Sequence, residues 1–130
     1  MTQANEEFMR ETYDLFVKGG VGAIIDRFDD DIAWHIFGRQ SPLARDWNGR
    51  IGVNEFFRDL VEMSEGTFRL EVQDVVAGDD RGVVFVHESA RRNNDSYEMD
   101  TVHVCRIKNQ KITEYWRYSP DIYRDDEFWS

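Results

Sequence analysis

The second half of the chain alternates long strand-like runs with very short polar connections, and this pattern restricts the fold more than any other. The runs are residues 67–76, 82–92, 96–107 and 111–119, and the connections between them read AGDD, NND and KNQ. Connections this short, rich in Asn, Asp and Gly, join neighbouring antiparallel strands. We therefore expect a four-stranded antiparallel meander.

Helical spacing dominates the first half of the chain. Apolar residues recur three and four positions apart in residues 5–18, 21–28 and 50–64, which predicts three helices. Between the last two, residues 32–37 read IAWHIF, a strand with apolar groups on both faces, and residues 38–49 form a long loop. The order predicts an α+β fold, in which a strongly curved, mainly antiparallel sheet wraps around three N-terminal helices as a cone-shaped barrel.

Size and charge limit the classes of protein to consider. The 130 residues fit a single domain spanning residues 1–130. A formal net charge of −10 opposes binding to nucleic acid or to an anionic membrane. Cys105 is the only cysteine, and the acidic start resembles neither a signal peptide nor a membrane span. We expect a cytoplasmic protein.

Large apolar residues fall on both faces of the predicted strands. One face lines the interior of the cone. The other face would remain an exposed apolar patch unless a partner covered it. We therefore expect a homodimer formed through the outer face of the sheet.

Several longer motifs occur along nearly the whole chain. They are DDIAWHIFGRQSPLARDWNG, GTFRLEVQDVVAGDDRGVVFVHESARR, the strand around residues 102–104, and KITEYWRYSPD followed by the terminal DEFWS. In this order they resemble the nuclear transport factor 2-like superfamily, and within it the SnoaL-like group related to polyketide cyclases and ketosteroid isomerases. The resemblance implies a cone-shaped scaffold used by isomerases, cyclases, dehydratases and epoxide hydrolases, and also by proteins without known catalysis.

The sequence departs from those relatives at positions that carry their chemistry. Ketosteroid isomerases use a carboxylate base and a protonated acid in the oxyanion hole. Matching the strands places Ile36 at the position of the base and His103 at that of the acid, so a steroid-isomerase mechanism lacks its base. Related epoxide hydrolases use an Asp-Arg-Asp cluster, for which the candidates are Asp100, Arg117 and Asp121.

His103 is our first candidate for catalysis. It lies in VHVC, on a strand expected at the centre of the sheet. A histidine facing an apolar cavity exchanges protons near neutral pH, because its ordinary pKa is about 6.5. The alternative is a buried histidine with structural hydrogen bonds only. Strand alternation places Asp100 on the opposite face, so these two residues form no simple dyad.

His87 lies on the neighbouring strand and is a second candidate. If the NND turn pairs Arg92 with Ser96, His87 shares the face of His103, and a register one residue different moves it to the other face. The three histidines lack the spacing of metal ligands, so we expect no metal site. Nothing in the chain resembles a phosphate-binding loop, and we expect no cofactor.

Two residues near the last strand complete the catalytic candidates. Asp121 follows that strand, where the family has an aspartate, and is a candidate carboxylate at the cavity rim; a capping role is the preferred alternative. Tyr115, or Tyr118 in its place, offers a phenol donor. Trp116 we interpret as core packing or part of the dimer face.

The remaining candidates are substrate-binding residues. They are Trp34, Trp47, Phe57, Leu60, His87, Tyr97 and Arg117. The terminal DEFWS either closes the opening of the cone or anchors on the outer surface.

The leading hypothesis is a small-molecule enzyme that holds an apolar, ring-containing substrate in the cone. It would catalyse a cofactor-independent isomerisation, cyclisation or dehydration, with His103 as acid and base and with Tyr115 or Asp121 assisting. The alternatives are a non-catalytic binding protein of the same fold and a structural dimer.

Overall fold

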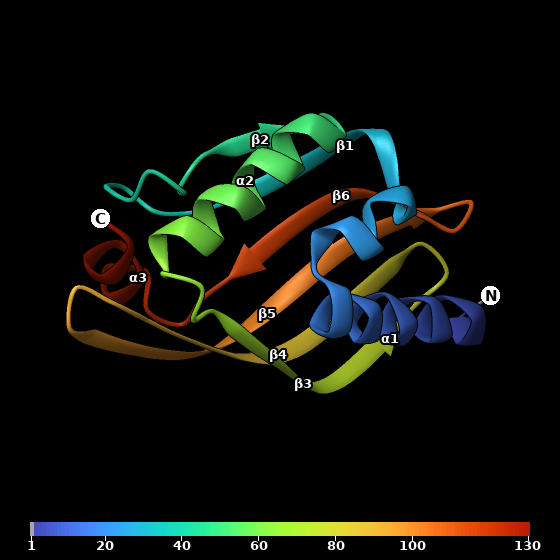
Figure 1. The fold of residues 1–130 in the computed structure, drawn as a ribbon. Coiled ribbons are helices and arrows are strands. Elements are labelled where there is room, and N and C mark those ends of the chain that lie inside the picture. Colours follow the sequence, from blue (N-terminus) through green and yellow to red (C-terminus); the bar gives the residue numbers. More distant parts are fainter. Residues whose placement is uncertain (1) are drawn as a thin grey trace.

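A computed structural model describes residues 2–130 (Figure 1). The helices are α1 (Thr2–Gly19), α2 (Gly49–Met63) and α3 (Ile122–Trp129), with two 3₁₀ turns, η1 (Val21–Ala23) and η2 (Ile25–Arg27), after α1. The strands are β1 (Phe28–Ile36), β2 (Asp46–Asn48), β3 (Arg69–Ala77), β4 (Arg81–Arg92), β5 (Asp95–Lys108) and β6 (Lys111–Tyr118).

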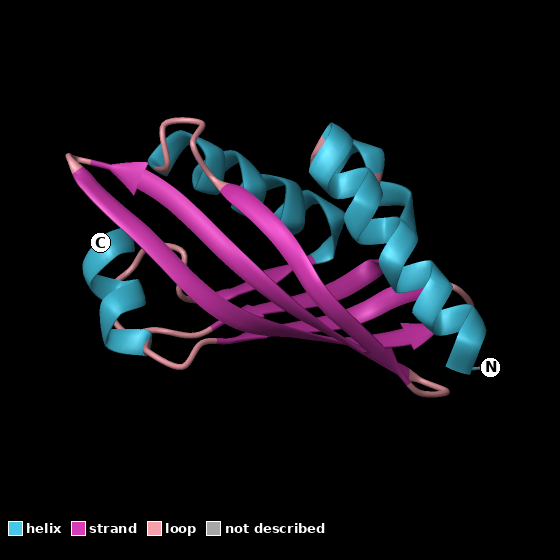
Figure 2. Ribbon diagram, turned by 90° about the horizontal axis from the view of Figure 1, so that it is seen from below, coloured by secondary structure: helices cyan, strands magenta, loops and turns pink. Residues whose placement is uncertain are grey.

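The six strands form one sheet in the order β2-β1-β6-β5-β4-β3. β1 and β6 are parallel, and every other neighbouring pair is antiparallel. The expected meander, β3 to β6, is therefore confirmed. The sheet curves strongly but stays open, with β2 and β3 as its edges (Figure 2).

The helices cover the inner face of this curved sheet. α1 packs against β3, and α2 packs against β1, while α3 lies at one end of the molecule, beyond the end of β6 (Figure 1). The core fills the space between them, and Met9, Ile32, Val53, Val84 and Val86 have no exposed surface. Burial of these apolar side chains stabilises the fold by roughly 1.5–3 kcal/mol each.

The second predicted helix was wrong. Residues 21–28 form η1 and η2, and strand β1 already begins at Phe28. Gly20 has a φ of 74°, so α1 cannot continue through it, and the segment that follows is too short to hold a stable α-helix. The acidic residues 29–31 consequently belong to a strand.

Two short elements were absent from the prediction. β2 pairs three residues of the expected long loop with β1, through Trp34 and Trp47, and α3 forms from the terminal segment. Within residues 2–130 no helix is both long and apolar enough to cross a membrane.

Candidate functional site

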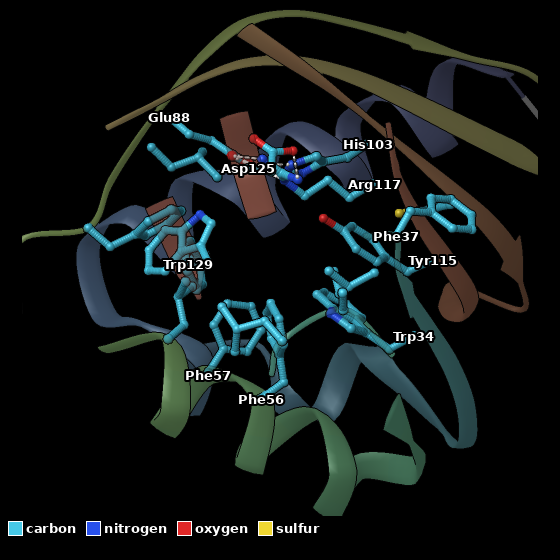
Figure 3. A pocket seen from close by; sticks show the side chains of 18 of the residues that line it. Trp34, Phe37, Phe56, Phe57, Glu88, His103, Tyr115, Arg117, Asp125 and Trp129 are labelled. Carbon is cyan, nitrogen blue, oxygen red and sulfur yellow. Dashed lines mark hydrogen bonds and ion pairs between the residues drawn. The ribbon is translucent and has the colours of Figure 1, made fainter. Parts of the chain in front are cut away.

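A pocket of about 80 Å³ lies between the inner face of the sheet and the helices (Figure 3). This volume is several times the roughly 10–15 Å³ that one water molecule requires. Most of its wall is aromatic or aliphatic, including Phe16, Phe28, Trp34, Phe56, Phe57 and Trp129. Polar side chains lie at one end, so the pocket combines an apolar wall with one polar end.

Four of the predicted substrate-binding residues, Trp34, Phe57, Leu60 and Arg117, line this pocket. Trp47 packs behind the wall instead, edge-on to the ring of Phe56. Their contact with a substrate stays a prediction.

Trp34 and Tyr115 form the centre of the aromatic wall. Their rings stack with centroids 3.6 Å apart (Figure 3). Trp34 Nε1 is buried without a hydrogen-bond partner among residues 2–130, although an unpaired buried donor costs about 1–3 kcal/mol. The Tyr115 hydroxyl also makes no hydrogen bond within this part of the chain, and it points toward the pocket interior (Figure 3). Tyr115 therefore has a free donor for a ligand.

The polar end is a continuous chain of buried hydrogen bonds that starts at Tyr13. Its hydroxyl lies 2.6 Å from His103 Nδ1, and His103 Nε2 lies 3.0 Å from Glu88 Oε2. Arg117 donates from Nη2 to Glu88 Oε1 at 2.7 Å and from Nη1 to Asp125 Oδ2 at 3.0 Å. Five residues from α1, β4, β5, β6 and α3 thus meet at one end of the pocket.

Hydrogen bonding determines which form of His103 is present. Burial would raise the pKa of Glu88, but the Arg117 charge and the bonds from His103 and Arg117 outweigh it, so this pKa lies far below its ordinary value. The ionised carboxylate only accepts, so His103 Nε2 carries the proton and donates to it. Nδ1 then accepts from Tyr13. Burial also lowers the pKa of His103, which keeps the ring neutral.

Tyr97 and Arg117, both predicted to bind substrate, differ in position. Arg117 lines the pocket. Tyr97 is buried beneath α3, where its ring stacks on Phe128 at 4.8 Å, and its hydroxyl accepts from Arg117 and donates to Asp125. Tyr97 therefore supports the cluster from behind and is not part of the pocket wall, and its contact with a substrate stays a prediction.

The β4–β5 turn places His87 outside the pocket. Asn93 and Asn94 have positive φ values and form a two-residue turn that pairs Arg92 with Asp95, one residue from the register that would join the histidines. His87 consequently lies opposite Asp100 on the outer face, where its Nδ1 is 2.7 Å from that carboxylate. Of the two registers left open by the sequence, the structure has the one that does not pair His87 with His103.

Asp121 is also outside the pocket. Its side chain accepts from the backbone N–H of Arg124 and caps α3, the alternative we preferred. The cluster of Asp100, Arg117 and Asp121 is therefore wrong, because Asp100 lies on the outer face and Asp121 caps a helix. Arg117 does lie between two carboxylates, but they belong to Glu88 and Asp125.

Tyr13, Glu88 and Asp125 were missed by the sequence analysis. Glu88 carried a usable signal, because it alternates with Val84 and Val86 on the buried face of β4, where a charged residue requires a partner. Tyr13 follows the apolar spacing of α1 and reads as ordinary core. Asp125 lies in a segment without strong periodicity.

The terminal segment closes the same end of the pocket. Phe128 and Trp129 are buried, and Trp129 lines the wall. The Asp126 carboxylate accepts hydrogen bonds from the backbone N–H groups of Arg39, Gln40 and Ser41. A Cβ at Gly38 would lie 2.7 Å from Asp126 Oδ1, so a glycine there leaves room for the carboxylate. Through these hydrogen bonds Asp126 holds α3 against the loop that follows β1.

No group of three or more histidine, cysteine or acidic side chains in residues 2–130 is arranged to hold a metal ion. Cys105 is buried, and burial raises the pKa of its thiol to about 12, so it is not a reactive thiolate.

Comparisons with solved structures find proteins of similar fold. Bal32a, from a soil-derived mobile gene cassette, is 28% identical over 99% of this chain and 98% of its own, with a TM-score of 0.92. A nuclear transport factor 2-like protein from Burkholderia xenovorans LB400 is 20% identical over 100% of this chain and 98% of its own, with a TM-score of 0.80. TerC, co-crystallised with polyporic acid, is 19% identical over 95% and 97%, with a TM-score of 0.78.

No protein with a curated description matches the chain. A sequence model of the SnoaL-like domain matches residues 9–115, which contain all of the pocket except its α3 side and Arg117. The resemblance inferred from the sequence motifs is confirmed, and the fold agrees with it. The chain therefore has the fold of a nuclear transport factor 2-like protein, and it belongs to the SnoaL-like family, a family of small-molecule-binding domains that often act as enzymes.

Proposed function

We propose that the protein is an enzyme that binds an apolar, ring-containing molecule in the pocket and moves a proton on it without a cofactor. The observation that carries this proposal is the buried polar chain around His103 at the end of an otherwise apolar pocket. Isomerisation, cyclisation and dehydration all need this combination of a dry binding site and a positioned base.

The neutral His103 ring supplies the base, and Glu88 stabilises the imidazolium that forms when the ring accepts a proton. Burial raises the pKa of Tyr115 well above its ordinary value, so its free hydroxyl stays protonated and donates to oxygen on the substrate. The similar protein TerC was crystallised with an organic molecule, polyporic acid, which supports a small organic substrate here. A cytoplasmic location stays a prediction.

Kemp elimination of 5-nitrobenzisoxazole tests the proposed base without knowledge of the natural substrate. In this reaction a base removes the proton on carbon 3, the ring N–O bond breaks, and a coloured phenolate forms. We expect catalysis above the buffer rate. His103→Gln should lower kcat/KM by about 10²-fold or more, because the amide preserves both hydrogen bonds of the ring but accepts no proton. The melting temperature should change little.

His87→Gln is the matched control, because His87 lies on the outer face of the sheet. It should leave the rate unchanged. The catalysed rate should also persist below pH 6.5, since burial lowers the pKa of His103 and its base form survives to lower pH. Binding of the probe with no rate above buffer would instead favour a non-catalytic binding protein.

We also propose that two copies pair through the outer face of the sheet. Two neighbouring apolar rows cross the strands there: Tyr118, Val102 and Phe85 in one, and Trp116, Val104, Val83 and Val76 in the other. A mainly acidic row, Glu71, His87 and Asp100, flanks one side, and an arginine-containing row, Arg81, Arg106 and Glu114, flanks the other. A two-fold pairing places the acidic row of one copy over the arginine-containing row of the other. This charge complementarity supports a second copy of the chain as the partner that covers this face.

Phe85→Glu tests this pairing, because Phe85 is 39% exposed and lies in the apolar rows beside Val102 of β5 and two residues from Val83 of β4. Size-exclusion chromatography should give a dimer for the unchanged protein and a monomer for the variant, since a charge in the dry centre of an interface is costly. Ile51→Glu on α2 is the control: Ile51 is 78% exposed away from the sheet, and its replacement should leave the dimer intact. A monomeric unchanged protein at micromolar concentration excludes the proposal.

A further inference from the structure

The hydrogen bonds of His103 raise the question of which atom receives the substrate proton. Nδ1 is occupied by the Tyr13 hydroxyl and Nε2 by Glu88. Neither ring nitrogen has a lone pair directed at an empty part of the pocket. We propose that Tyr13 is the catalytic residue that contacts the substrate, and that its hydroxyl passes the proton on to Nδ1 of His103. This inference rests on the enzymatic function proposed above.

Tyr13 is placed to reach a ligand. It belongs to α1 and lines the pocket. Within residues 2–130 its hydroxyl has one hydrogen-bond partner, His103. A phenolic oxygen that donates one hydrogen bond still has lone pairs to accept another. The oxygen of Tyr13 can therefore accept a proton from a molecule in the pocket.

The buried charges favour movement of a proton toward His103. With His103 neutral, Glu88 and Asp125 carry two negative charges against the single positive charge of Arg117. An imidazolium at His103 compensates the remaining negative charge at a distance of 3.0 Å from Glu88. The cluster therefore accepts one proton and keeps it close to the pocket until it returns to the substrate.

The transfer balances as two linked steps. The substrate C–H bond breaks, its electron pair stays on the substrate, and the proton binds the Tyr13 oxygen. The original hydroxyl proton moves at the same time to Nδ1 of His103, which becomes imidazolium. Burial raises the pKa of Tyr13 well above its ordinary value, and the nearby groups Cys105, Tyr115 and Glu88 raise it further. A free phenolate would therefore be costly. Both protons move together, which avoids that phenolate. Reversal of the two steps returns the proton to another atom of the substrate.

Tyr115 cannot replace Tyr13 in this relay. Its ring lies edge-on to His103 with centroids 5.2 Å apart, but its hydroxyl forms no hydrogen bond to the histidine. Its hydroxyl donates a hydrogen bond to an oxygen of the substrate, but it has no hydrogen bond through which a proton could pass to His103. The two tyrosines therefore have separate roles, which single substitutions can distinguish.

Tyr13→Phe, Tyr115→Phe and His103→Gln are compared in the Kemp elimination of 5-nitrobenzisoxazole. We expect Tyr13→Phe to lower kcat by about 10²-fold with little change in KM. The variant carrying both Tyr13→Phe and His103→Gln should be no slower than either single variant, because residues that act as a unit are not additive. Tyr123→Phe is the control, since Tyr123 is 80% exposed on α3.

A second measurement uses the unchanged protein, so it does not depend on folding of the variants. Bound 5-nitrobenzotriazole, an unreactive probe of the same shape, should give NMR contacts to the ring protons of Tyr13. Full activity of folded Tyr13→Phe, together with loss of activity in His103→Gln, overturns the relay but preserves the proposed function. Contacts to His103 without contacts to Tyr13 overturn the relay as well. Absence of any rate above buffer in the unchanged protein overturns both.

Discussion

Replacing Arg117 with methionine is expected to lower the free energy of unfolding by about 3–5 kcal/mol. The guanidinium is almost fully buried and donates to Glu88, Asp125 and Tyr97. Its removal leaves two buried carboxylates without a compensating positive charge. Urea denaturation at neutral pH measures the change. The slope of the unfolding free energy against urea concentration is compared between variants.

Two further variants make this result specific. Arg58→Met removes an exposed arginine 3.9 Å from Glu55 on α2, and it should change stability by less than about 0.5 kcal/mol. Adding Glu88→Gln to Arg117→Met should recover part of the loss, because one of the uncompensated charges is then gone. An Arg117→Met variant as stable as Arg58→Met would mean that water reaches the cluster and that the polar end of the pocket is not dry.

The sheet was predictable because its signals are local. Short connections rich in Asn, Asp and Gly determine antiparallel neighbours, whatever the rest of the chain does. The helices α1 and α2 likewise follow from apolar spacing along a single segment. Segment 21–28 was predicted wrongly, because its five apolar residues in eight are compatible with a helix that is too short to be stable.

The contents of the pocket were less predictable because they depend on the register between strands. A two-residue turn at Asn93 and Asn94 pairs Arg92 with Asp95, and a shift of one residue would have turned His87 inward. His103 was identified because a histidine among valines on a central strand stands out. Its partners were not, since Tyr13 lies 90 residues away on another element. Periodicity predicts the face a residue occupies, but it does not predict which distant side chain meets it there.

Asp126→Ala is the substitution expected to release the closed end of the pocket. Its carboxylate accepts from three backbone N–H groups, of Arg39, Gln40 and Ser41, which all lose their partner in the variant. Hydrogen bonds to a charged group contribute about 1.5–3 kcal/mol each when buried. Because these hydrogen bonds are only partly buried, water replaces part of the loss in the variant, and we expect destabilisation of about 2–3 kcal/mol. Hydrogen exchange should also become faster in the loop and in α3.

The effect of Asp126 depends on pH in a defined direction. Desolvation would raise its pKa, but the hydrogen bonds from Gln40, Ser41 and Arg39 outweigh it, so the pKa in the folded protein lies below the ordinary value of about 3.9. Its contribution to stability is therefore fully present above that ordinary value and is lost as the pH falls through the lower folded value. The difference in urea midpoint between Asp126→Ala and the unchanged protein should narrow as the solution becomes more acidic than about pH 3.9.

Glu127→Ala is the matched control for this prediction, because Glu127 is a carboxylate on the same helix with a largely exposed ion pair to Arg124. It should change stability by less than about 0.5 kcal/mol at any pH. If both variants lose the same stability, or if the loss in Asp126→Ala does not depend on pH, the carboxylate does not fasten the loop. The closed end of the pocket would then be held by the apolar contacts of Phe128 and Trp129 alone.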